Sequence, residues 1–158
     1  MSWRARGYII YEELSREGFI PSQEIVESKI VAVTECVETI PCNVCQTACP
    51  VKAISVKGLS GRPSINWQSC TGCGICVGVC PGQAMFLVGR FGDGYVVGVP
   101  YEFLPKARKG ISVTLLGRDG RELGEGEIVR VFEVNKTQVV LVKVPRDLVW
   151  EVRSIRVK

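Results

Sequence analysis

Histidine is absent from the sequence, so the chain offers no imidazole as a base or as a metal ligand. This absence excludes catalysis by a histidine general base and lowers the expectation that the chain performs acid–base chemistry by itself. Metal sites that need histidine, including two-iron clusters of the Rieske kind, are excluded as well.

Long hydrophobic runs are also missing, and no apolar stretch is long enough to span a bilayer. The apolar patch at residues 8–11 is followed by Glu12 and Glu13, which does not fit a secretory signal peptide. The sequence therefore predicts a cytoplasmic protein without a membrane span, in a reducing compartment that keeps thiols available.

Cysteine, by contrast, is concentrated, because seven of the eight cysteines lie within residues 42–85. This stretch contains one pattern written twice, and an offset of 31 positions superimposes the two copies. The superimposed pairs are Cys42 and Cys73, Cys45 and Cys76, Cys49 and Cys80, Pro50 and Pro81, and Ala53 and Ala84. A repeat built on reactive residues indicates two related metal-binding loops.

The second copy has a further cysteine, Cys70, which completes the run C-x2-C-x2-C-x3-C-P. Over roughly residues 30–90 the chain resembles the bacterial-type ferredoxins that hold two [4Fe–4S] clusters. In that family each loop presents three thiolates to one cluster, and its Cys-Pro cysteine reaches the neighbouring cluster. The resemblance implies that the second cluster is held by Cys49, Cys70, Cys73 and Cys76.

The first copy departs from this pattern because Thr39 stands where the second copy has Cys70. Cys36 lies three residues earlier, so either a longer loop brings Cys36 into the empty position or the cluster has only three cysteines. We favour the longer loop. The first cluster would then be held by Cys36, Cys42, Cys45 and Cys80.

Zinc binding and disulfide bonding fit the cysteine pattern less well. Zinc also uses C-x2-C pairs, but a zinc-stabilised interaction module needs neither the Cys-Pro step nor crossed ligands. A disulfide framework suits small secreted chains, and C-x2-C neighbours are poorly placed for several bridges at once. Eight inert core cysteines gathered in about 45 positions would be unusual.

The predicted fold class is α+β: a ferredoxin-like two-cluster (βαβ)2 domain at residues 30–89, preceded by an extension at 1–29 and followed by a small β domain at 90–158. Strands are expected at 30–33, 54–57, 64–67, 85–88, 95–97, 111–116, 126–134 and 139–144. A short helix is expected at 47–52, a helical turn ending at Gly18 and another opening at Pro21. The segment after Pro145 fits either a helix or a strand.

Glycine and charge carry further expectations for the cluster loops. Gly72, Gly74 and Gly78 are expected to let backbone N–H groups approach sulfur. No carboxylate lies between Glu38 and Asp93, and negative charge near a cluster disfavours adding an electron. The clusters should therefore accept electrons from a moderately reducing donor.

Clusters held by cysteine alone have no open coordination site, so the chain should move single electrons and have no catalytic residues of its own. No glycine motif for a flavin or nicotinamide is present, so FAD or FMN is expected only on partner subunits. The formal charge of +4 would be nearly cancelled by two clusters, so nucleic acid is not an expected partner.

A narrower resemblance involves residues 35–45 together with the β tail. These segments resemble the ferredoxin-like small subunits of multi-subunit flavin-dependent amino-acid dehydrogenases, which oxidise proline, hydroxyproline or related amines. The resemblance implies a cysteine ligand at Cys36 and flavoprotein subunits as partners. Residues 90–158 are expected either to cover the ferredoxin unit or to dock on a catalytic subunit, and we favour docking because a free ferredoxin needs no such module. The chain would thus be an electron-transfer subunit of an oxidoreductase complex; a freely diffusing ferredoxin is the alternative.

Overall fold

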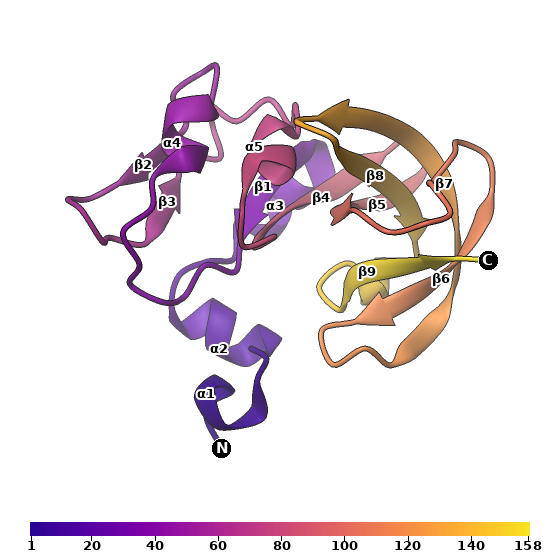
Figure 1. The fold of residues 1–158 in the computed structure, drawn as a ribbon, viewed down its shortest axis with the longest axis horizontal. Helices are drawn as coiled ribbons and strands as arrows, with labels where there is room; N and C mark the ends of the chain where they lie inside the picture. Colours follow the sequence, from indigo (N-terminus) through magenta and orange to yellow (C-terminus); the bar gives the residue numbers. More distant parts are fainter.

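A seven-stranded antiparallel sheet is the largest element of the computed structural model, which describes residues 1–158 (Figure 1). The strand order is β1 (Ile30–Thr34), β4 (Met85–Phe91), β5 (Gly94–Tyr101), β8 (Thr137–Val144), β7 (Glu122–Val134), β6 (Ser112–Gly117) and β9 (Val152–Val157). Helices accompany the strands, in keeping with the expected α+β class.

The sheet curls until β9 lies near β5 without pairing with it, so residues 94–157 form an open barrel (Figure 1). The register shifts at Leu115/Leu116, Leu116/Gly117 and between Ile128 and Arg130. Extra residues of this kind bend strands and increase their twist, which allows the sheet to close on itself.

Apolar β-branched residues explain the strands at the centre of the sheet. All but one of the residues of β8 are buried, because valine and leucine occupy both faces of the strand, as its sequence predicts. The larger core, of 33 buried residues, runs from Val31 in β1 through Val96 in β5 to Ile155 in β9. The core also contains Cys45, Cys70 and Cys76.

The expected boundary at residue 89 falls inside β4. This strand pairs with β1 on one side, where Val88 lies opposite Val31, and with β5 on the other, where Val88 lies opposite Val97. Residues 90–158 therefore continue the sheet that residues 30–89 begin. That they dock on a partner stays a prediction.

The cysteine loops lie at one end of the sheet, with a second sheet of two strands, β2 (Ile54–Val56) and β3 (Pro63–Ile65) (Figure 1). Each loop carries a five-residue helix, α4 (Val44–Ala48) or α5 (Ile75–Val79). The helix expected at 47–52 is therefore placed too late. Helix α4 ends at Ala48 because Cys49 has an extended backbone, which the following Pro50 favours.

The N-terminal segment folds into α1 (Trp3–Arg6), α2 (Tyr11–Arg16) and α3 (Gln23–Ser28). Gly18 lies just beyond α2 with a φ of 80°, as expected for a residue that ends a helix. At the other terminus a 3₁₀ turn (Arg146–Leu148) precedes β9, so the segment after Pro145 begins with a helical turn and ends as a strand. No helix has the length and hydropathy needed to cross a membrane.

Candidate metal centre

The two cysteine loops have nearly identical backbones. Cys49 follows α4 with φ and ψ of −69° and 114°, and Cys80 follows α5 with −67° and 115°. Each cysteine precedes a proline, which favours this extended conformation and turns the chain away from the helix. The sequence repeat is thus also a structural repeat.

The first group of thiols comprises Cys36, Cys42, Cys45 and Cys80. Burial raises the pKa of the Cys36 thiol, and the neighbouring thiols of Cys80 and Cys42 raise it further, whereas Arg62 opposes them. Burial likewise raises the pKa of Cys45, to which Cys80, Cys42 and Cys36 add. These four side chains lie close enough to act on one another, and they are the residues expected around the first cluster.

The second group comprises Cys49, Cys70, Cys73 and Cys76, which together line one pocket with apolar neighbours such as Ala32 and Ile54. Burial raises the pKa of the Cys76 thiol to about 12, and the thiols of Cys70, Cys73, Cys45 and Cys49 contribute. These four are the residues expected around the second cluster. Since Cys45 belongs to the first group, the two groups are neighbours.

Backbone N–H groups donate to three of the sulfur atoms. Ala53 donates to Cys49 Sγ and Ala84 donates to Cys80 Sγ, each at 3.3 Å and each from four residues further along the chain. Ala32 in β1 donates to Cys70 Sγ, also at 3.3 Å. Such bonds favour the thiolate form and stabilise the reduced state of an iron–sulfur cluster.

The donor set fits iron–sulfur clusters better than single metal ions. All eight cysteines are free, and no group of three or more Cys, Asp or Glu side chains gathers closely enough to hold one ion. Four thiolates around one zinc would lie only about 3.8 Å apart, given a Zn–S length of roughly 2.3 Å. The thiolates of a four-iron cluster lie further apart because each binds a different iron. All eight cysteines, Cys36 included, therefore stay predicted ligands of iron–sulfur clusters.

The glycines of the second loop have a role different from the expected one. A Cβ atom on Gly72 would lie 2.5 Å from Ile30 O, and one on Gly74 would lie 2.8 Å from Phe132 Cζ. A Cβ atom on Gly78 would overlap Val134 Cβ. These glycines therefore allow β1 and β7 to pack against the loop, and the N–H donors to sulfur are alanines.

The N-terminal segment packs against the first cysteine loop. Ile9, Leu14 and Phe19 form a small second core with Val37, next to Cys36. Trp3 Nε1 donates to Glu38 Oε1 at 3.0 Å. The expected N-terminal extension thus covers part of its own chain.

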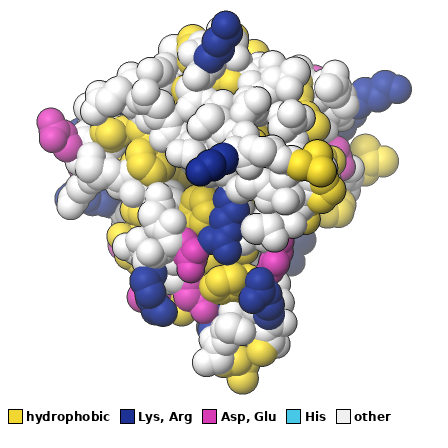
Figure 2. Space-filling view, turned by 90° about the vertical axis from the view of Figure 1, so that its left-hand side faces the viewer, with side chains coloured by type: hydrophobic (Ala, Val, Ile, Leu, Met, Phe, Trp, Pro, Cys, Tyr) yellow, Lys and Arg dark blue, Asp and Glu magenta, His cyan; other side chains and the backbone are white.

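The face that carries the loops is unevenly charged. Figure 2 shows acidic and basic side chains alternating on its lower, N-terminal part, whereas the upper part is mostly uncharged. Apolar side chains near the cysteines stay exposed, among them Ile40 (46%), Val44 (39%) and Val51 (41%). The loops therefore present an apolar surface with few carboxylates.

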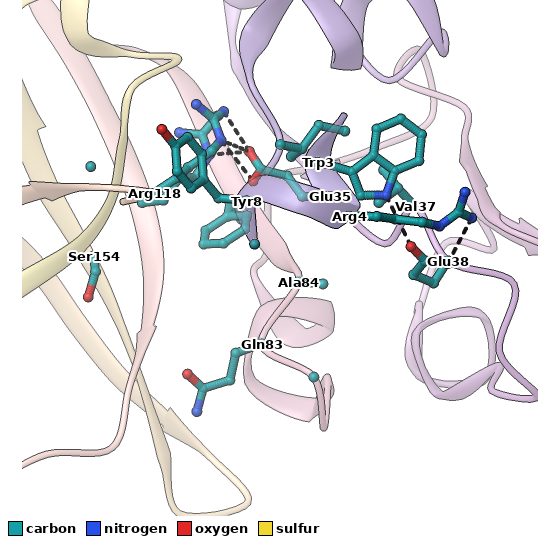
Figure 3. Close-up of a pocket in the computed structure, with 16 residues that line it drawn as sticks. Trp3, Arg4, Tyr8, Glu35, Val37, Glu38, Gln83, Ala84, Arg118 and Ser154 are labelled. Atoms are coloured by element: carbon teal, nitrogen blue, oxygen red, sulfur yellow. Dashed lines mark hydrogen bonds and ion pairs between the residues drawn. The ribbon is translucent and has the colours of Figure 1, made fainter. Parts of the chain in front are cut away.

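A cleft of about 630 Å³ lies beside the first loop, between the N-terminal segment and the ends of β6 and β9 (Figure 3). Arg118 and Arg153 line it and both bind the carboxylate of Glu35. Burial opposes ionisation of Glu35, but the two guanidinium groups hold the pKa of its carboxyl below its usual value. Burial lowers the pKa of Arg153 to about 10.

Sequence reasoning missed this buried ion-pair network. Glu35, Arg118 and Arg153 are separated by up to 118 positions, and isolated charges of this kind are usually solvated. The only signal in the sequence is the position of Glu35 next to Cys36.

Comparison with known proteins agrees with the cysteine geometry. Residues 35–84, which contain all eight cysteines, match the family described as the 4Fe-4S dicluster domain. This part of the chain is therefore a ferredoxin-type domain, and iron–sulfur binding and electron transfer are the chemistry that such a domain supports.

A curated relative is the "Ferredoxin-type protein NapF" of Haemophilus influenzae, with 43% identity over 49 residues. The match covers 29% of this chain and 28% of the relative, so the chain spans little more than a quarter of that protein. No solved structure matches the chain.

Proposed function

We propose that this chain is the electron-transfer subunit of a cytoplasmic dehydrogenase complex. It would relay electrons through two [4Fe–4S] clusters, from a flavin-containing subunit that oxidises an amino acid or amine to an external acceptor. The observation that carries the proposal is the crossed arrangement of the thiols: Cys80 lies with the first group, and Cys49 with the second.

The clusters, when bound, would supply reversible one-electron redox chemistry. The residues of the chain fix their place and their potentials. The eight thiolates would bind one iron each, which would leave no position open for a substrate. The N–H groups of Ala53, Ala84 and Ala32 stabilise negative charge on sulfur and so favour the reduced state.

Two features support a partner rather than a free carrier. The exposed Ile40, Val44 and Val51 surround the cysteine loops with apolar surface of the kind found at interfaces. The barrel of residues 94–157 adds a substantial structure that a minimal ferredoxin does not need. The flavin-dependent amine dehydrogenase is the partner that the narrower sequence resemblance implies.

Two measurements test this proposal. Anaerobically purified protein should contain about eight iron atoms and eight acid-labile sulfides per chain, the content of two clusters. Colourless protein with bound zinc would contradict it. Affinity purification from the native source should then recover a flavin-containing subunit in a fixed ratio. A chain that elutes alone at its own mass would favour the free ferredoxin.

A further inference from the structure

Cys36 has fewer local restraints than Cys70, the cysteine expected to play the same part in the second copy. Residues 35–43 form neither helix nor strand. The N–H of Cys36 donates to Thr34 Oγ1 at 3.1 Å, and no N–H group donates to its sulfur. Cys70, in the second copy, receives a hydrogen bond at Sγ from Ala32 in β1. Another interaction must therefore hold Cys36.

Glu35, the residue before Cys36, is fixed at both its main chain and its side chain. Its N–H donates to Ala84 O at 2.8 Å, which extends the pairing of β1 with β4 by one residue. Its carboxylate accepts bonds from Arg118 Nε at 3.0 Å and Nη2 at 2.7 Å (Figure 3). It also accepts a bond from Arg153 Nε at 2.6 Å.

This attachment determines where the next side chain points. Cys36 is the central residue of a three-residue turn, in which Val37 N–H donates to Glu35 O at 3.0 Å. A fixed Glu35 therefore fixes the start of this turn and limits where the Cys36 side chain can lie. Cys80 and Cys42 are near it, because their thiols act on the Cys36 thiol.

Both arginines are buried, and Arg153 is also held by the main chain and an aromatic ring. Arg153 Nη1 donates to Val149 O at 2.9 Å and to Val152 O at 2.6 Å, and its guanidinium lies 5.2 Å from the ring centroid of Phe86. The side chains of Arg118 and Arg153 are 7% and 3% exposed. A mobile surface pair would not fix a ligand, whereas buried bidentate arginine contacts have a single geometry.

We infer that Arg118 and Arg153 are positioning residues that act through Glu35 to hold Cys36 as the fourth ligand of the first cluster. The inference rests on the proposed function, since it requires two clusters. It gives residues 90–158 a part in building the first cluster, in addition to any docking.

The test measures iron release to a chelator from the anaerobically purified full chain. Release from two clusters should have two phases, which Cys42→Ser and Cys73→Ser assign by abolishing or accelerating one phase each. Glu35→Gln removes the charge at almost constant shape. It should accelerate the first-cluster phase by about tenfold to a hundredfold, the usual effect of losing a partner that orients a ligand, and leave the second phase unchanged.

Matched variants separate positioning from general stability. Glu133→Gln breaks the exposed pair with Lys106 and should change neither phase. Arg118→Lys keeps the charge but loses the bidentate grip, so it should affect the first phase alone. If Glu35→Gln fails to take up iron, Arg118→Lys provides the test of positioning in its place.

Three outcomes would overturn the inference: no change in either phase, equal acceleration of both, or an equal effect of Glu133→Gln. Wild-type protein without iron would instead remove the proposed function. Because wild-type iron content and the split between phases are separate readouts, the two failures can be told apart.

Discussion

Phe132 covers the backbone of Gly74 so closely that a Cβ atom there would lie 2.8 Å from Phe132 Cζ. Gly74 lies between Cys73 and Cys76, whereas Phe132 belongs to β7 in the C-terminal half of the chain. The barrel therefore packs directly on the loop that carries three cysteines, and a change in either should be felt by the other.

Gly74→Ala should destabilise the protein for two reasons. Its φ of 80° disfavours a Cβ atom by about 1 kcal/mol, and overpacking against Phe132 adds roughly 1–3 kcal/mol. Urea unfolding measures the sum. Gly120→Ala is the matched control, because Gly120 has a φ of 82° and no atom near its Cβ position. An equal loss of unfolding free energy in the two variants would show that Phe132 moves aside without destabilising the protein.

Gly78→Ala tests the neighbouring contact, where the new Cβ atom would overlap Val134. Without the strain of a positive φ, the expected loss is about 1–3 kcal/mol from overpacking alone. Gly82→Ala, with open space around it, should cost much less. Combining Gly78→Ala with Val134→Ala should recover part of the loss, and a simple sum of the two single losses would argue against direct contact.

Cys36→Ser tests whether Cys36 is the fourth ligand of the first cluster. If Cys36 binds the first cluster, iron per chain should fall from about eight toward about four, because a serine hydroxyl is a much poorer iron ligand than a thiolate. Iron analysis and absorption near 400 nm measure the loss. Thr39→Ser alters a residue at the empty repeat position and should change neither. An unchanged spectrum in Cys36→Ser would remove Cys36 from the ligand set.

Glu27 should make the stability pH-dependent. The Tyr95 hydroxyl donates to the Glu27 carboxylate, and the positive charges of Arg146 and Arg90 also favour its ionised form. Burial opposes ionisation, but these interactions outweigh it, so the pKa of Glu27 is lowered. A lowered folded-state pKa stabilises the protein above the unfolded value, near 4.5, and the gain is lost as the pH falls through the folded value.

The corresponding measurement compares urea midpoints of wild type and Glu27→Gln from pH 7 to pH 4. Wild type should be the more stable at pH 7, and the difference should shrink below about pH 4.5. A difference that stays constant over this range would mean that the charge of Glu27 does not matter.

The potentials should respond to charge near the loops. Reversing Lys52, whose N–H donates to Cys49 O, brings a negative charge close to the clusters. A unit charge about 10 Å away in water changes the free energy of adding one electron to a cluster by about 0.4 kcal/mol. Lys52→Glu replaces a positive charge by a negative one, so it should lower a one-electron potential by roughly 20–40 mV. A redox titration measures this, with Lys106→Glu as control. Wild-type couples at the bottom of the known range would contradict the expected ease of reduction.

The sequence alone predicted the local features well because their causes are local. The Cys-Pro steps at Cys49 and Cys80 are visible as a repeat, and they produce the same backbone in both loops. Period-two and all-apolar patterns placed most strands within a few residues. The helix near Thr47 was misplaced because its bounds follow from the cysteines around it rather than from helix propensity.

Only the tertiary structure revealed that residues 90–158 continue the sheet of the cysteine domain. The spacing of residues in the sequence does not predict that β5 pairs with β4. Nor does it predict that Glu35 binds Arg118 and Arg153, which lie far along the chain. Thiol spacing depends on a few bonds along the backbone, so the sequence determined the metal chemistry. Strand order and buried ion pairs depend on which residues, distant in the sequence, pack against one another and exclude water. Only the tertiary structure shows which residues these are.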